Sequence, residues 1–375
     1  MLESIELYNF KSARELKVRL AALTVLTGLN GSGKSTVLQV LALLKQSLHT
    51  DARPQNLVLR GQLIQLGRSE DVLSENAGDD DIRFIIQTPK GRTSLSALAE
   101  PDSDTLKLSC DGSVKDVVNA LDKGFQFIQA DRITPAIQYQ QASTPDRAAG
   151  WLGCGGEYTV DFLLQNETKK ISHKRFAPPS PALSDDLLKQ VAPTGSLLDQ
   201  TSGWLQHLSP GVQPRATAVK LSDSVSLKFS YIGIGSNRHE RRPSNVGFGL
   251  TYCLPIIVAC LAAPKGALLL LENPEAHLHP RGQFALGLLL ARCAADGVQI
   301  IIETHSDHVL NGVRIAAKRA DISSDDVAVH FFSRNIASGE TSLISPILHA
   351  NGRFSEWPDG FFDEWSNALD ELLED

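Results

Sequence analysis

A stretch of nine residues, Gly28 to Thr36 (GLNGSGKST), has the composition of a loop that binds the phosphates of a nucleotide. Its glycines let backbone N–H groups turn toward phosphate oxygens without a Cβ in the way. Lys34 can reach the β- and γ-phosphates, and the hydroxyl of Ser35 can complete the ligand shell of Mg²⁺. A chance match in a turn before a helix is the alternative, but every position of the motif is filled. The predicted nucleotide-binding residues of the loop are Gly28, Asn30, Gly31, Ser32, Gly33, Lys34, Ser35 and Thr36.

An acidic residue and a histidine follow two strongly apolar segments in the second half of the chain. Glu272 comes directly after Ala267–Leu271, and His305 lies shortly after Val298–Ile302. In an open α/β sheet, the carboxyl ends of such strands line the crevice where ligands bind. Glu272 is therefore predicted to hold the Mg²⁺ that the loop presents. His305 can point at the γ-phosphate, with helix capping or packing as its alternative roles.

The segments around these residues must form buried strands and a helix. Leu23–Leu26 is an apolar run before the loop, and Val37, Leu41 and Leu44 after it recur with the spacing of one helical face. Strand, glycine loop and helix start, in that order, bring the N–H groups of a helix N-terminus to the phosphates. The continuous apolar character of Ala267–Leu271 is typical of a strand that is buried on both faces of a parallel sheet.

Alternating patterns elsewhere predict a side sheet of antiparallel strands. Ile5–Phe10 alternates as a strand should, and a second strand follows around Leu16–Leu20. Ile82–Gln87 and Leu106–Ser109 have the pattern of hairpin-like strands between polar loops. Phe125–Ala130 is a further apolar strand. The predicted fold class is α/β, a mostly parallel core with an antiparallel side sheet.

The character of the chain changes between residues 138 and 218. Proline clusters separate short helical patterns at Asp185–Gln190 and Ser196–His207, and we interpret this region as a partly helical insertion. Its run Lys169–Arg175 is the best candidate for contact with a polyanion such as nucleic acid, although charge runs are usually solvated faces. The predicted domains are 1–137 and 219–345 for the two parts of the core, 138–218 for the insertion and 346–375 for a C-terminal segment.

Composition limits the compartment and the partners. The 375 residues carry a formal net charge of −7, so binding to nucleic acid would need a local basic patch. The five cysteines show no CxxC spacing, which favours a reducing compartment and argues against a zinc site. Every apolar run long enough to cross a membrane is interrupted by charges or helix breakers. We therefore expect a soluble, cytoplasmic protein without a membrane partner.

Taken together, these motifs resemble ABC-related ATPases of the RecF, structural-maintenance and OLD type. The phrase ENPEAHLHP (272–280) is particularly similar to OLD-like and AAA-type ATPases of prokaryotes. Further motifs resemble a family of prokaryotic ATPases with a short C-terminal domain of unknown function, often encoded near nuclease or other effector genes. They are FIQADRITP (127–135), NVGFGLTYCLP (245–255), THSDHVLNGVR (304–314) and NGRFSEWPDGFFD (351–363). The resemblance implies an ABC-type (RecF/OLD-like) P-loop ATPase that binds ATP and Mg²⁺.

The resemblance also implies roles for individual residues. Glu272 takes the place of the strand-end acid, and His305 that of the switch histidine that senses the γ-phosphate. Residues 244–249 occupy the place of the signature segment, which closes on the nucleotide of the opposite subunit. A helix N-terminus suits that task because its N–H groups attract phosphate. A head-to-head homodimer around ATP is therefore implied, in which the signature ligands are Ser244, Asn245, Gly247 and Gly249.

One position departs from the pattern of the family. The general-base glutamate normally follows the strand-end acid, and here that position is Asn273. An amide can orient a water molecule but cannot accept its proton. Either Glu275 takes the catalytic role or Glu272 does both jobs. We expect slow hydrolysis, with ATP serving mainly as a clamp and a switch.

Three functions remain open from the sequence. The first is an ATP-driven switch that controls an effector protein, a nuclease or toxin from a neighbouring gene, as in prokaryotic anti-phage defence. The second is a DNA-repair ATPase of RecF type, which predicts DNA-stimulated hydrolysis and a basic face. The third, a transporter motor, is disfavoured because the HLHP phrase and the C-terminal motif are foreign to that class.

Overall fold

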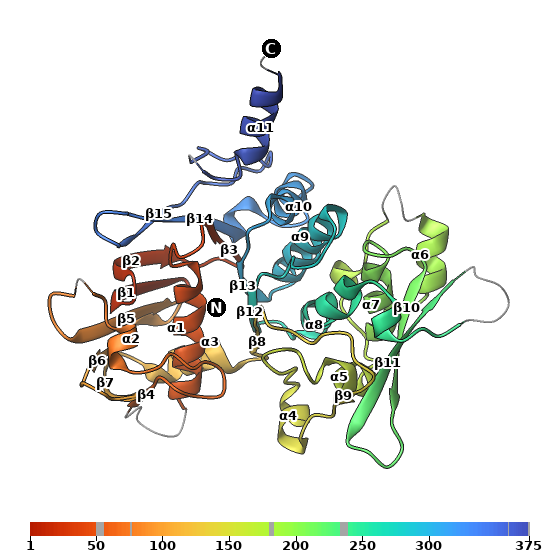
Figure 1. Cartoon of the computed structure of the whole chain (residues 1–375), viewed down its shortest axis with the longest axis horizontal. Coiled ribbons are helices and arrows are strands. Elements are labelled where there is room, and N and C mark those ends of the chain that lie inside the picture. Colours follow the sequence, from red (N-terminus) through yellow and green to blue (C-terminus); the bar gives the residue numbers. More distant parts are fainter. Residues whose placement is uncertain (50–55, 76, 180–183, 233–238, 359, 374–375) are drawn as a thin grey trace. The chain divides into compact units, whose positions relative to one another are not determined.

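The structure, a computed structural model, describes residues 1–49, 56–75, 77–179, 184–232, 239–358 and 360–373, with the backbone alone at 364–367. The chain divides into two compact units, whose helices and strands are labelled in Figure 1. The first unit comprises Met1–Lys123, Ile301–Asp307 and Ser323–Asp375. The second comprises Gly124–Ile300 and His308–Ile322.

An antiparallel sheet of six strands, in the order β2-β1-β5-β6-β7-β4, forms much of the first unit (Figure 1). Each neighbouring pair is antiparallel. In the first strand Ile5 and Leu7 are fully buried while Glu6 is half-buried, as the alternation predicts. The predicted side sheet is thus confirmed. Its strands are β1 (Ser4–Phe10), β2 (Ala13–Arg19), β4 (Asn56–Val58), β5 (Asp81–Thr88), β6 (Gly91–Leu98) and β7 (Thr105–Asp111).

The strand before the glycine loop, β3 (Leu23–Gly28), belongs to a second sheet. It pairs in parallel with β14 (Val327–Arg334), which pairs antiparallel with β15 (Thr341–Ile344). The division between the two units falls within β13 (Gln299–Glu303), so this strand begins in the second unit and ends in the first. Just past it, the N–H of Thr304 donates to the carbonyl of Leu26 at 3.0 Å.

The helix after the loop, α1 (Lys34–Ser47), packs on β3, β4 and α3. Val37, Leu41 and Leu44 have no exposed surface, which confirms the predicted buried face. The other helical segments of the first unit are α2 (Ser69–Val72), α3 (Val114–Asp122), η3 (Ser324–Asp326) and α11 (Glu364–Leu373).

The second unit combines short sheets with most of the helices (Figure 1). Its strand β12 (Leu268–Glu272) pairs in parallel with β8 (Gln126–Ile128). Helix α8 (Phe248–Ala262) is buried without interruption from Leu250 to Leu261, as expected for a helix that is apolar all round. A three-stranded antiparallel sheet has the order β10-β11-β9, from β9 (Tyr139–Gln140), β10 (Val212–Ala218) and β11 (Ser224–Tyr231). The other helical segments are α4 (Thr144–Ala149), α5 (Thr159–Gln165), η1 (His173–Arg175), α6 (Asp185–Val191), α7 (Leu197–Leu205), η2 (Pro243–Asn245), α9 (Pro280–Ala295) and α10 (Asp307–Lys318).

Some elements differ from the predicted ones. Strand β6 was not predicted because its core-facing side carries small or polar residues, such as Thr93 and Ala97. Helix α3 was missed although Val117, Val118 and Leu121 form a buried stripe. The predicted domain limit at residue 218 falls between β10 and β11, which pair with each other. The domain limits remain a prediction. Among the described residues, no helix is long and apolar enough to span a bilayer.

The basic run Lys169–Arg175 requires a correction at its last residue. Arg175 is only 3% exposed, and its Nε donates to Oδ2 of Asp296 at 2.9 Å. Its Nη1 donates to the carbonyls of Cys260 and Ala263 at 3.0 and 2.6 Å. This guanidinium therefore fastens η1 to the C-terminal ends of α8 and α9 and is not available to a polyanion. Lys174, in contrast, is exposed.

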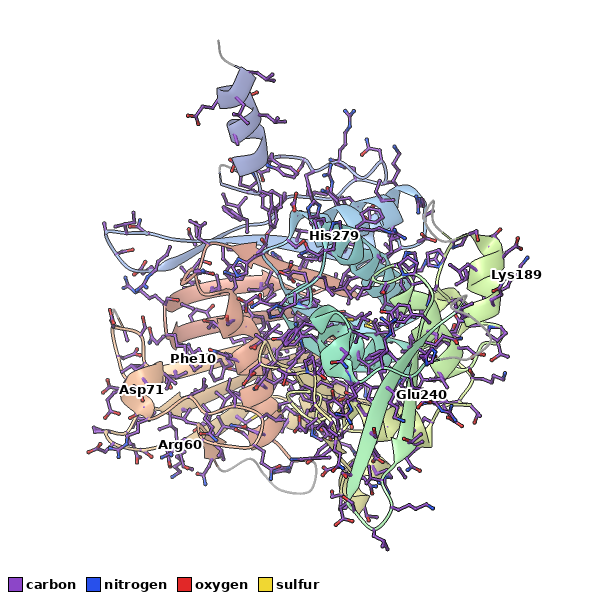
Figure 2. All side chains as sticks on the ribbon, turned by 45° about the vertical axis from the view of Figure 1, so that its right-hand side comes forward. Phe10, Arg60, Asp71, Lys189, Glu240 and His279 are labelled. Carbon is purple, nitrogen blue, oxygen red and sulfur yellow. The ribbon has the colours of Figure 1, made fainter. Side chains whose placement is uncertain are left out.

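The buried ion pair leads to a prediction for stability. Arg175→Ala leaves the carboxylate of Asp296, whose side chain is 2% exposed, without its main partner. We expect a loss of about 3–5 kcal/mol in the free energy of unfolding, measured by urea denaturation. The matched control is Arg215→Ala, which breaks an exposed pair with Glu240, labelled in Figure 2 beside the β10–β11 hairpin. That change should cost less than about 1 kcal/mol, and equal losses for the two variants would contradict the prediction.

Candidate nucleotide-binding site

The glycine loop makes a tight turn between β3 and α1 that two of its glycines permit. Gly28 has φ +138°, and a Cβ there would lie 2.1 Å from the carbonyl oxygen of Phe332 on β14. Gly33, which caps α1, has φ +97°, and a Cβ there would lie 2.5 Å from Oγ1 of Thr341. Gly31 has φ +74° and nothing within 4 Å of its Cβ position. The loop is thus held tightly on its inner side and has open space at Gly31.

Lys34 is the buried cation of this loop. It is 3% exposed, and its Nζ donates to the carbonyls of Gly28 and Leu29 at 2.9 and 2.7 Å. The carboxylate of Glu303, at the end of β13, lies 3.9 Å from Nζ. Burial lowers the pKa of Lys34, and the charge of Glu303 opposes that shift. An anion at the loop would add further negative charge beside this buried ammonium.

A hydroxyl network supports the loop from the C-terminal strand β15. Oγ1 of Thr341 donates to the carbonyl of Ser32 at 3.0 Å and shares a hydrogen bond of 2.8 Å with Oγ of Ser12. The N–H of Thr341 donates to the carbonyl of Ser12 at 2.9 Å. No local sequence pattern indicates this role for Thr341, because it lies more than 300 positions from the loop.

The loop fits the phosphates of a nucleotide. The Oγ of Ser32 is buried and has no hydrogen-bond partner within the described part of the chain. It lies beside Lys34 at the N-terminus of α1, where a helix presents N–H groups and the positive end of its dipole. Ser35 is half-buried and Thr36 buried, whereas Asn30 is exposed. An orphan hydroxyl, a buried ammonium and a helix N-terminus together suit an anion, and the binding of a nucleotide by these residues stays a prediction.

In the second unit, the end of β12 is held by a buried arginine. Arg132 is 3% exposed and donates to the carbonyls of Glu272 and Asn273 at 2.8 and 2.9 Å. Its guanidinium lies 4.3 Å from the ring centroid of Tyr252, a cation–π contact. Oε2 of Glu272 accepts from the N–H of Ala130 at 3.1 Å. Arg132 therefore holds the backbone at Glu272, the predicted metal-binding acid, and at Asn273. Burial lowers the pKa of the Arg132 guanidinium.

The segment that follows Glu272, residues 273–280, contains a sharp turn of the backbone. Asn273 has φ +41° and His277 φ +62°, both left-handed. Glu275 is 8% exposed and contributes charge that favours the cationic form of Arg132. The ring of His277 packs edge-on against the rings of Phe248 and Tyr252, with distances of 4.7 and 4.8 Å between the ring centroids.

His279 caps a helix through a hydrogen bond to the backbone. Its Nδ1 accepts from the N–H of Arg281 at 3.3 Å and caps α9, at the position labelled in Figure 2. The described residues contain no group of three or more His, Cys, Asp or Glu side chains that could hold a metal ion. The Mg²⁺ ligands Ser35 and Glu272, one in each unit, therefore remain a prediction.

The signature-like segment lies on the surface at the start of α8. Ser244 and Asn245, in η2, are exposed, and so is Gly247 at the N-cap of α8. The Cβ position of Gly247 has nothing within 4 Å, whereas that of Gly249 lies 2.6 Å from the carbonyl of His277. Gly249 thus allows α8 to approach the ENPEAHLHP turn, and Gly247 leaves the helix N-terminus accessible.

The site residues fall into two sets, one in each unit. The loop, Glu303 and His305 belong to the first unit, and Glu272, Asn273, Glu275 and the signature-like segment to the second. His305 is exposed. Glu303, which the sequence analysis did not select, is 6% exposed and is the charge partner of Lys34. The sequence could have identified Glu303 as a candidate, because it ends an apolar core strand just as Glu272 does.

Three family models match successive parts of the chain. Residues 1–116 match an "AAA ATPase domain", and residues 161–311 match an "AAA domain, putative AbiEii toxin, Type IV TA system". Residues 322–372 match a "Protein of unknown function (DUF3696)". The chain is also 26% identical over 184 residues to the energy-dependent translational throttle protein EttA of Escherichia coli (strain K12) and of Shigella flexneri. That match covers 48% of this chain and 30% of EttA, so the chain spans less than a third of the length of these curated relatives.

Solved structures share the fold. An SMC head bound to the C-winged helix domain of ScpA superposes with a TM-score of 0.52 and 15% identity, covering 92% of this chain and 97% of that one. A Smc head domain with an extended coiled coil, bound to the C-terminal domain of ScpA derived from Pyrococcus furiosus, superposes with a TM-score of 0.52 and 15% identity. This match covers 99% of this chain and 99% of that one. The likeness at this identity shows the fold alone. The chain has the α/β P-loop ATPase fold of SMC heads, and the family matches support an ABC-like AAA ATPase.

Proposed function

We propose that this protein is an ATP-binding and ATP-hydrolysing switch that dimerises head-to-head around ATP and controls a partner effector protein. The observation that carries the proposal is the buried Lys34 ammonium at the N-terminus of α1, with the orphan hydroxyl of Ser32 beside it. Such a site selects a ligand with several negative oxygens. The family matches to AAA ATPase domains support ATP as that ligand.

Each residue of the site has a definite task in this proposal. The N–H groups from Gly31 to Thr36 surround the phosphates, and Lys34 donates to the β- and γ-oxygens. Ser35 and Glu272 hold Mg²⁺, which supplies neutralisation of the charge on those oxygens. His305, exposed two residues past the end of β13, contacts the γ-phosphate, and Glu275 and Glu272 are the candidate bases from the sequence.

Dimerisation around ATP is supported by the accessible N-terminus of α8. The exposed segment Ser244–Gly249 presents N–H groups and a glycine with open space, which suits the approach of a phosphate from another molecule. In a head-to-head pair, each nucleotide would lie between the loop of one copy and the segment of its partner. ATP would then contact both subunits and stabilise the dimer.

Control of an effector is supported by the description of the family matched at residues 161–311. That description refers to a toxin of a Type IV toxin–antitoxin system. We propose a role in prokaryotic anti-phage defence, where a nuclease or toxin would be the partner. The RecF-type alternative, a DNA-binding ATPase, loses part of its support because Arg175 of the basic run is buried. Stimulation of hydrolysis by DNA would favour that alternative.

The first test of the proposal concerns Lys34. Lys34→Ala removes the cation aimed at the phosphates, and we expect ATP affinity to fall at least about 10- to 100-fold in titration calorimetry, as for a lost charge-assisted hydrogen bond. Lys45→Ala on the same helix is the matched control, because Lys45 pairs with Asp122 away from the loop. Unchanged affinity in Lys34→Ala would disprove the phosphate loop.

The support of the loop by Thr341 gives a second test. Thr341→Val keeps the shape of the side chain but removes the hydroxyl that hydrogen-bonds to the carbonyl of Ser32 and the hydroxyl of Ser12. A hydrogen bond of this kind contributes about 0.5–1.5 kcal/mol, so ATP affinity should fall about 2- to 10-fold. Thr341→Ser should restore it, and Ser342→Ala, on the same strand, should have no effect. Wild-type affinity in Thr341→Val would show that the network does not shape the loop.

The third test addresses the dimer. Gly247 has φ −59° and open space around its Cβ position, so Gly247→Asp and Gly247→Ala should both fold. The aspartate adds a carboxylate where the partner's phosphates would lie. We expect the wild type and Gly247→Ala to dimerise with a non-hydrolysable ATP analogue in analytical ultracentrifugation, and Gly247→Asp to bind the analogue as a monomer. An analogue-dependent dimer of Gly247→Asp would refute this arrangement.

A further inference from the structure

Glu303 is a buried acid that the proposed roles above do not use. Its side chain is 8% exposed, it ends β13, and its Oε1 lies 3.9 Å from Nζ of Lys34. We propose that Glu303 accepts the proton of the water that attacks the γ-phosphate. This inference rests on the proposed ATPase function and deepens it by naming the catalytic base.

The position of Lys34 locates Glu303 relative to the reaction. In a phosphate loop, the lysine ammonium binds the β- and γ-oxygens. The carboxylate of Glu303 lies 3.9 Å from that ammonium, so a γ-phosphoryl group bound by Lys34 would lie near this carboxylate. A general base can act directly or through one water, so the geometry suits a base for the attacking water.

Glu303 is more than a counter-ion for Lys34. A direct hydrogen bond between an ammonium and a carboxylate is about 2.7–2.9 Å long, and the observed 3.9 Å is well beyond that. The Lys34 ammonium instead donates to the carbonyls of Gly28 and Leu29. The carboxylate is therefore placed to accept from a water while the ammonium binds phosphate.

The other acids are less suited to the role. Asn273 cannot accept a proton, and Oε2 of Glu272 accepts the N–H of Ala130 at 3.1 Å. Glu275 contributes to the electrostatic field of Arg132 in the second unit. Glu303 belongs to the same unit as the loop, and its distance from Lys34 is directly defined.

The proposed step balances in atoms and charge. The water oxygen forms a bond to the γ-phosphorus, and the bond between that phosphorus and the β–γ bridging oxygen breaks. The electron pair of the broken bond leaves with ADP. One proton of the water passes to the Glu303 carboxylate and is released later with the product, so the base is regenerated.

The experiment separates binding from chemistry. Glu303→Gln keeps the shape of the side chain but removes the proton acceptor, so it should bind ATP at least as tightly as the wild type. Its single-turnover hydrolysis rate should fall about 10²- to 10⁴-fold, the usual value of general-base help. Glu303→Asp, which keeps a carboxylate, should recover part of the rate and guards against a failure of the glutamine variant to fold. The matched control is Glu6→Gln, which also breaks a glutamate–lysine pair but on β1, and it should hydrolyse ATP normally.

Three outcomes would overturn the inference. Normal single-turnover hydrolysis by Glu303→Gln would remove the base from this position and leave the proposed ATPase intact. Loss of ATP binding in that variant with a normal rate for the bound fraction would make Glu303 a support of Lys34 only. A wild-type protein that binds ATP without any turnover would refute both the base and the hydrolysing part of the proposed function.

Discussion

The structure depends on placing the ammonium of Lys34 out of water. A buried cation is costly unless groups of opposite polarity surround it. Here the carbonyls of Gly28 and Leu29 and the carboxylate of Glu303 provide that surrounding. Each of these groups is held by a different part of the first unit: the carbonyls by the turn after β3, and the carboxylate by the end of β13. The close approach of Gly28 to β14 keeps the turn in place.

The parts of the site that are contiguous in sequence could be predicted. The loop has a composition that few other structures require, and the apolar run before Glu272 identifies a core strand end. The side sheet followed from alternation, except at β6, where Thr93 and Ala97 replace large apolar residues. Helix α3 has an apolar stripe at Val117, Val118 and Leu121, so it could have been predicted from the sequence but was missed.

What could not be predicted depends on contacts between distant segments. Thr341 supports the loop through hydrogen bonds to Ser12 and Ser32, which no local pattern encodes. Arg132 holds the carbonyls of Glu272 and Asn273 from about 140 positions away. Arg175 lies in a run that resembles a solvated basic patch, yet it is buried, and it donates to Asp296 and to the carbonyls of Cys260, Leu261 and Ala263. The sequence shows that a residue is charged, but only the fold determines whether its side chain is buried.

The backbone at Asn273 has a consequence for the evolution of this site. Its φ of +41° is a left-handed conformation, which costs most L-residues about 1–2 kcal/mol but is readily adopted by asparagine. Arg132 enforces this conformation by binding the carbonyl of Asn273 at 2.9 Å. A glutamate at this position would have to strain the turn or release the arginine. The asparagine therefore suits the turn, and a chain with this turn gives up the carboxylate that would otherwise follow the strand-end acid.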